Sequence, residues 1–375
     1  MKKTDVYIWC LGAFLCSYTF QSCSREEIQS ADQDAMQFSP KEIVFYKKYD
    51  SGFNNKPEST AIHEILFKDG FTSEPCEITD FGRILSGYSE ALLKDPLFDP
   101  GLIFYYTELH RKYVTYYVGE NYYGENGEYD QTAKKRIREL ESFWNLNREI
   151  RLNGQHFKSL EDREILTDMI ESFDRTVRNR DEAYEKADWL LEINKLSPNI
   201  PENPFFSLDA FTRSNGLLVI GDGLLQSLVD VGIEGKVAFS SILAHEWWHQ
   251  VQFENDLEWN SASSLPPMAE RSRFSELEAD FAAAYFLSHK RGATYNWKRI
   301  ADYFELSFNV GDCLTNSSQH HGTPTQRSMA ARAGFDLADS AKKKGSVLEA
   351  GEVHNAFLKF YNSIILGTDL EYLSV

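Results

Sequence analysis

The chain has 375 residues, 42% of them hydrophobic and 14% aromatic, which is enough for one large domain or two smaller ones. Its formal net charge is -18 at pH 7. Nucleic-acid binding depends on Lys and Arg side chains that neutralise phosphates, so a chain this acidic is not expected to have a nucleic-acid partner.

Residues 1–22 have the organisation of an export signal. A short basic start precedes an apolar stretch at 6–16, which is too short to cross a bilayer. The sequence FQSC, ending at Cys23, resembles the lipobox of bacterial lipoproteins, although Phe20 stands where leucine is usual. The resemblance implies that Cys23 is acylated after cleavage; a plain cleaved signal and an uncleaved anchor are the alternatives. We therefore expect an exported lipoprotein, anchored in a membrane such as the outer membrane and facing the periplasm or the cell surface.

The remaining chain divides by sequence texture. Residues 23–40 are polar and aperiodic, which is typical of a tether. Residues 41–200 are mostly helical by pattern, with apolar residues at three- and four-residue spacing between charges. After the proline-rich break SPNIPENP, residues 201–375 combine two short strands around the turn TRSNG with several helices. The predicted fold class is α+β and predominantly helical, with a small sheet. Cys76 and Cys313 are the cysteines left for a disulfide, and their pairing stays open.

The segment LAHEWWHQVQ at 243–252 raises the main functional question. On a helix, His245 and His249 share a face, so both imidazoles can bind one zinc ion. Glu246 lies about 100° round the helix from His245, beside the metal, where a base can deprotonate a water. The alternative is a buried helix whose histidines pack with Trp247 and Trp248. Its inward polarity would then need another partner.

A catalytic zinc site needs a third protein ligand and an open fourth position. The segment SELEADFAAAYF supplies Glu276 and Asp280, four residues apart on one helical face. We expect Glu276 to be the third ligand and Asp280 to accept the free N–H of a ligand histidine. Glu278 points roughly 200° away from Glu276, so only one of the two can face the histidines. Taken alone, these carboxylates would suit a solvated helix face.

Three blocks of this sequence resemble the neutral zinc metallopeptidase family of bacteria. Members have H-E-x-x-H followed closely by Gln, then E-L-x-A-D, then H-G-T-x-x-Q-R, and this chain has HEWWHQVQ, SELEAD and HHGTPTQR in that order. The segment LDAFT…LLVIGDGLL also resembles the strand and turn that precede the zinc helix in the CAAX-prenyl-protease type of peptidase. The resemblance covers about residues 205–340. It implies a zincin-like, gluzincin-type fold, with one Zn²⁺ held by His245, His249 and Glu276.

The third block has physical content of its own. Thr323 and Gln326 form a capping box with Pro324 at the first helical position, so a helix begins just after His321. His321 is a candidate catalytic residue that could hydrogen-bond the oxyanion of a tetrahedral intermediate. Alternatively, His321 only packs or caps the loop. Arg327 is expected to have a structural role.

These observations favour a zinc-dependent endopeptidase, with Glu246 as the general base and a peptide or protein as substrate. One alternative is a non-catalytic surface lipoprotein that keeps the zinc fold to bind peptides or glycans. Another is a structural zinc site, but such sites are usually closed by four protein ligands, often cysteines, which are scarce here. Neither the substrate preference nor the oligomeric state follows from the sequence.

Overall fold

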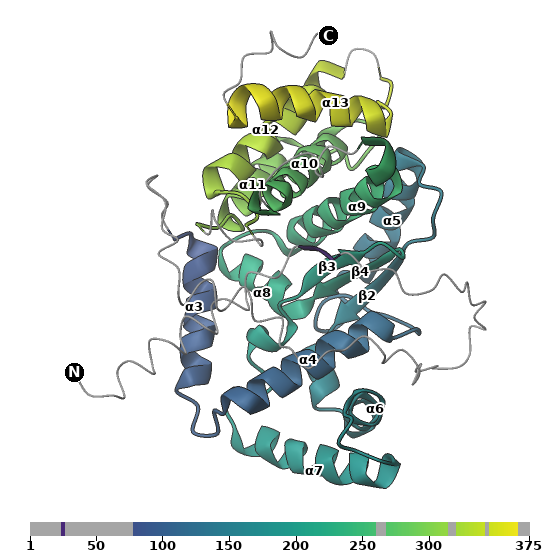
Figure 1. Cartoon of the computed structure of the whole chain (residues 1–375). Helices are drawn as coiled ribbons and strands as arrows, with labels where there is room; N and C mark the ends of the chain where they lie inside the picture. Colours follow the sequence, from purple (N-terminus) through teal and green to yellow (C-terminus); the bar gives the residue numbers. More distant parts are fainter. Residues whose placement is uncertain (1–23, 27–77, 260–267, 314–319, 342–344, 367–375) are drawn as a thin grey trace.

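The computed structural model describes residues 24–26, 78–259, 268–313, 320–341 and 345–366 (Figure 1). The predicted signal segment and Cys23 lie outside these residues, as does most of the predicted tether. Within the described part of the chain, no helix is both long and apolar enough to cross a membrane. Cys313 is disulfide-bonded, and every other cysteine lies outside the described residues.

The fold is predominantly helical with one small sheet, as the sequence predicts. The strands are β1 (Ser24–Glu26), β2 (Arg151–Gln155), β3 (Ala210–Arg213) and β4 (Leu217–Gly221). The α-helices are α3 (Asp80–Leu93), α4 (Pro100–Tyr116), α5 (Asp130–Trp144), α6 (Arg163–Phe173), α7 (Arg180–Leu196), α8 (Asp222–Asp230), α9 (Gly235–Trp259), α10 (Met268–Ser288), α11 (Trp297–Asn309), α12 (Pro324–Ala341) and α13 (Ala350–Phe360). Short helical segments cover Phe157–Leu160, Pro204–Ser207 and Tyr361–Ile365.

The strand order in the sheet is β1-β3-β4-β2. β3 and β4 form the predicted antiparallel pair around the turn, while β2 runs parallel to β4. β2 lies in the region predicted to be mostly helical. It forms one edge strand of the sheet. The hydrophobic core also runs through both halves of the chain. Residue 200 therefore marks a change of sequence texture rather than an edge of the core.

The helices form layers on the two faces of the sheet (Figure 1). α9 packs on one face, against β3 and β4, and α4 lies on the other face. Beyond α9 come α10 and then α12 and α13, whereas α6 and α7 lie beyond α4 at the opposite end (Figure 1). This arrangement places α9 at the centre of the molecule.

Local sequence signals set where several helices begin. Asp99 caps α4 by accepting a hydrogen bond from the Leu102 backbone N–H, and Pro100 follows at the first helical position. The predicted capping box of α12 is present. The Thr323 backbone donates to the Gln326 side chain at 3.1 Å, and the Gln326 backbone donates to the Thr323 hydroxyl at 3.3 Å.

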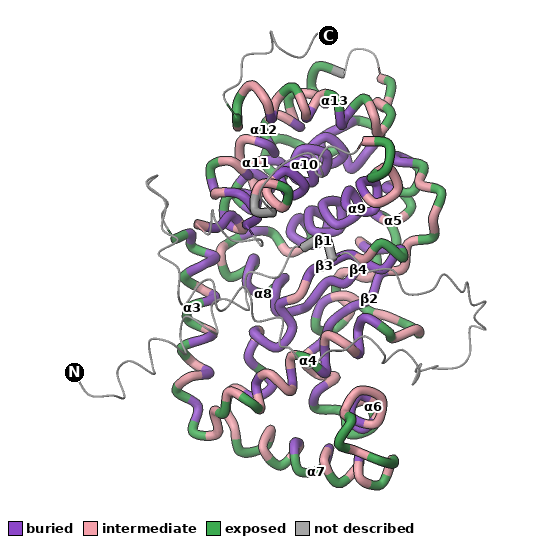
Figure 2. Tube along the Cα trace, viewed as in Figure 1, coloured by how far each residue is buried: buried purple, intermediate pink, exposed green. Residues whose placement is uncertain are grey.

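α9 and α10 are buried on every side over most of their length, as Figure 2 shows. Every residue of α9 from 237 to 252 is buried, and so is every residue from 274 to 289 in and just after α10. A helix without a polar face belongs in the centre of a large core. The polar side chains of these two helices must therefore find partners inside the protein.

Small residues let α10 and α12 approach closely. Gly334 of α12 faces the backbone of α10, where an added Cβ would overlap the Phe281 carbonyl oxygen and lie 3.1 Å from the Ala284 Cβ. Ala330 and Ala331 are fully buried in the same seam. Arg327 precedes Gly334 by two helical turns on the same face, so this close approach brings Arg327 up to α10.

We expect Gly334→Ala to destabilise the protein by about 1–3 kcal/mol, because the new methyl group overpacks a backbone contact. Gly87→Ala is the matched control: Gly87 is exposed in the interior of α3, and an added Cβ there meets nothing within 4 Å. That change should instead stabilise the protein by about 0.5–1 kcal/mol through helix propensity. Thermal and denaturant unfolding of the two variants distinguishes these cases. Equal stability of both would argue against the close contact.

Candidate metal centre

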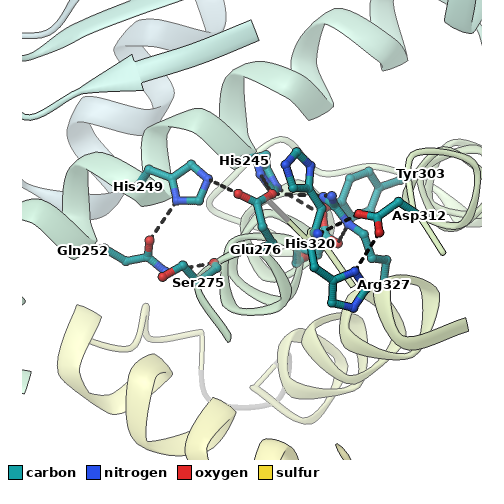
Figure 3. A network of polar contacts seen from close by, with 11 residues as sticks. His245, His249, Gln252, Ser275, Glu276, Tyr303, Asp312, His320 and Arg327 are labelled. Carbon is teal, nitrogen blue, oxygen red and sulfur yellow. Dashed lines mark hydrogen bonds and ion pairs between the residues drawn. The ribbon is translucent and has the colours of Figure 1, made fainter. Parts of the chain in front are cut away.

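Two helices bring three metal-ligating side chains together. His245 and His249 lie one turn apart on α9, and Glu276 reaches them from α10 (Figure 3). One ligand atom from each lies within 4.8 Å of the others. The Glu276 carboxylate spans both rings, with Oε2 at 3.2 Å from His245 Nε2 and Oε1 at 3.5 Å from His249 Nε2. Together the three residues can hold a metal ion.

Each imidazole has its second nitrogen engaged away from the centre. His245 Nδ1 lies 3.1 Å from Asp280 Oδ1, and His249 Nδ1 lies 2.8 Å from Gln252 Oε1. A partner at Nδ1 keeps a proton on that nitrogen, so that Nε2 is the atom that would ligate a metal once any proton on it is lost. Asp280 thus lies beside one candidate ligand histidine, as expected. Gln252, to which the sequence alone assigned no role, lies beside the other.

Arg327 connects the two carboxylates of α10. Its guanidinium donates to both oxygens of Asp280, at 2.6 Å and 2.9 Å, and Nη1 lies 3.4 Å from Glu276 Oε2. The Tyr303 hydroxyl donates to the Asp280 backbone carbonyl at 3.0 Å. Arg327 is only 1% exposed, so its charge depends on these carboxylates for compensation. Its role is structural, as expected, but it acts directly beside the candidate centre.

The histidines and carboxylates of the cluster stabilise one another's charged forms. Burial lowers the pKa of His245, but hydrogen bonds with Asp280 and Glu276 outweigh it and raise that pKa to about 9. Burial raises the pKa of Glu276, but electrostatic interactions with His321, His245 and His249 hold it well below its usual range. Burial acts likewise on Asp280, whose pKa Arg327 and His245 keep low. The site therefore combines anionic carboxylates with imidazoles.

The two candidate catalytic residues lie in this buried region. Glu246 is fully buried and follows His245 on the innermost part of α9. His321 is 4% exposed, and its electrostatic interaction with Glu276 lowers the pKa of that carboxyl. Its backbone N–H donates to Asp312 Oδ2 at 2.7 Å. Burial lowers the pKa of His321, although the charge of Glu276 opposes the shift.

The His320 side chain contacts the same carboxylate as the His321 backbone. Its Nδ1 lies 2.7 Å from Asp312 Oδ1, the other oxygen of the carboxylate that accepts the His321 backbone N–H (Figure 3). Asp312 therefore contacts both His320 and His321, just before α12 begins. The loop orients His321, and His320 contributes to its anchoring.

No known protein family, curated protein or solved structure matches this chain. The geometry of the centre thus carries the functional argument.

Glu278 lies on a different side of α10 from Glu276, as the helical register predicts. Its carboxylate accepts from Gln252 Nε2 at 2.7 Å and contacts His354 Nδ1 at 2.5 Å. It is nevertheless 1% exposed, so the alternative of a solvated helix face does not apply to it. Gln252 could have been noticed from its spacing of three residues after His249. His354 could not, since it belongs to a distant helix.

Glu276→Gln should lose most bound zinc, because a neutral amide replaces the one anionic donor that reaches both histidines. Glu278→Gln should retain a bound ion at saturating zinc, because Glu278 is not itself a ligand and contacts Gln252 rather than the two rings. Metal content of the two purified variants, measured beside the unsubstituted protein, decides between the two glutamates. A zinc-free Glu278→Gln beside a zinc-loaded Glu276→Gln would contradict the ligand assignment.

Proposed function

We propose that this protein is a zinc-dependent peptidase with a zincin-like, gluzincin-type catalytic fold. The observation that supports it best is the convergence of His245, His249 and Glu276, with Glu246 next in sequence to the first ligand. Two histidines and a carboxylate are the ligand set of many catalytic zinc sites. α9 provides the active-site helix, α10 the ligand-bearing helix, and β3 with β4 the small sheet ahead of them.

The contacts of Glu276 with the two histidines have the spacing of ligands on one zinc ion, in a group whose ligand atoms lie within 4.8 Å of one another. Donors about 2.0–2.1 Å from a tetrahedral zinc are separated from one another by roughly 3.3–3.4 Å. The two separations between Glu276 oxygens and histidine Nε2 atoms are 3.2 Å and 3.5 Å. Among the described residues this group has three members, which suits a catalytic site with one open position better than a closed structural site.

The surrounding residues would divide the work of peptide hydrolysis. A zinc ion held here would polarise a carbonyl group and lower the pKa of a water. Glu246 would accept a proton from the attacking water and deliver it to the leaving nitrogen. His321, which is buried just before α12 begins, would donate a hydrogen bond to the developing oxyanion. Asp280 and Gln252 would hold the histidine ligands in the required tautomer.

Glu246→Gln should keep zinc and fold but lower peptidase activity by at least about 10²–10⁴-fold, because a base of this kind contributes that much. Glu258→Gln, an exposed substitution near the end of the same helix, should leave activity unchanged. Zinc content and cleavage of a peptide library are measured on both proteins. Turnover by Glu246→Gln at the unsubstituted rate would exclude Glu246 as the base.

We also propose that the protein is exported and held at a membrane by a lipid on Cys23, as the lipobox-like sequence implies. Cys23→Ala should then move the protein from the membrane fraction to the soluble fraction and abolish incorporation of a labelled fatty acid. Ser24→Ala keeps the cysteine and should change neither. A Cys23→Ala protein that stays with the membrane would point to an uncleaved signal anchor.

A further inference from the structure

Gln252 has only one orientation that satisfies its neighbours. Its Nε2 lies 3.0 Å from the Ser275 backbone carbonyl and 2.7 Å from Glu278 Oε2, and both of these groups are acceptors. The amide nitrogen must therefore face them, which directs Oε1 to His249 Nδ1 at 2.8 Å (Figure 3). A rotated amide would oppose oxygen to oxygen. His249 Nδ1 must then carry the proton, so its Nε2 is free to ligate.

Glu278 is held in turn by the C-terminal helix α13. Its Oε1 lies 2.5 Å from His354 Nδ1, while Oε2 accepts from Gln252. The His354 ring stacks on Trp259 at the end of α9, with ring centroids 4.2 Å apart and planes 9° apart. His354 is 4% exposed and Glu278 1% exposed, so bulk water does not compete for these contacts.

We infer that His354, Glu278 and Gln252 form a positioning relay that fixes the tautomer and orientation of His249. Through this relay α13 contributes to the metal centre by way of Glu278 and Gln252. The inference rests on the proposed metal site. In physical terms, a donor on α13 orients a carboxylate on α10, that carboxylate orients an amide on α9, and the amide orients the ligand.

The two histidine ligands are thereby oriented by different means. His245 bonds directly to Asp280, whose charge Arg327 compensates. His249 Nδ1 bonds to a neutral amide, and the anion that this amide contacts, Glu278, is one residue further away. An amide can turn over, whereas a carboxylate has no wrong orientation. This difference explains why the His249 side requires further partners to define its geometry.

Two substitutions at His354 separate positioning from packing. His354→Phe keeps an aromatic ring on Trp259 but removes the hydrogen bond to Glu278. His354→Asn keeps a donor where Nδ1 stands but removes the ring. If His354 positions the ligand, His354→Phe should weaken zinc affinity about tenfold, which is the low end for loss of a residue that orients a ligand. His354→Asn should then retain most of the zinc affinity. A purely packing role predicts the reverse order.

His156 provides the matched control. It is also buried, its Nδ1 lies 2.7 Å from Asp222 Oδ2, and its ring stacks on Tyr122 at 3.7 Å. Neither it nor Asp222 has a hydrogen bond or ion pair with the candidate ligands in the described part of the chain. His156→Phe should therefore lower thermal stability without changing zinc affinity.

A reciprocal exchange tests the coupling between the two inner members. Gln252→Glu alone places two carboxylates face to face and should weaken zinc affinity by more than about tenfold. Adding Glu278→Gln restores an amide–carboxylate pair and should recover part of that loss. Independent residues would instead give losses that add.

The experiment measures zinc affinity by competition with a chelator, on full-length protein whose folding is followed by thermal unfolding. The visible spectrum of the Co²⁺-substituted protein serves as a second readout of ligand geometry. A His354→Phe protein with unchanged zinc affinity and Co²⁺ spectrum would overturn the relay alone. Failure of the unsubstituted protein to bind zinc would overturn the proposed function and the relay together.

Discussion

The structure depends on one constraint: charged side chains in the centre of a large core need partners that compensate their charge. α9 and α10 are buried on every side, yet they carry histidines and carboxylates at positions where most helices of this kind carry apolar residues. Leaving such groups unpaired would cost several kcal/mol each. For the candidate ligands the protein meets this cost with hydrogen bonds and ion pairs that link them to Gln252 and Arg327 (Figure 3).

Two outer helices, α12 and α13, supply partners for the carboxylates of α10. Arg327 of α12 can neutralise Asp280 only because Gly334 and the buried alanines of the seam let the two helices approach. His354 of α13 contacts Glu278, and its ring stacks on that of Trp259. Packing around α10 and the electrostatics of the centre are therefore two aspects of one arrangement.

The sheet and the N-terminal half contribute differently. β3 and β4 support α9 from below, and β2 completes that sheet from a region that otherwise forms helices. α5 packs against α9, where its Trp144 meets Trp248 edge to face with ring centroids 4.7 Å apart. The tryptophans between the two histidines thus belong to the core.

The sequence alone determined the features that follow from helical periodicity. The spacing of His245 and His249 placed them on one face, and the register of SELEAD put Glu276 and Asp280 on one side and Glu278 on another. Short-range signals also predicted the β3–β4 turn and the capping box of α12, because each depends on residues within a few positions of one another. Only the tertiary structure decided which distant helices complete the site. The contacts of Arg327 with Asp280 and of His354 with Glu278 span 47 and 76 residues, and no local pattern encodes such pairs. The position of β2 beside β4 is likewise set by long-range pairing, which a helical context conceals.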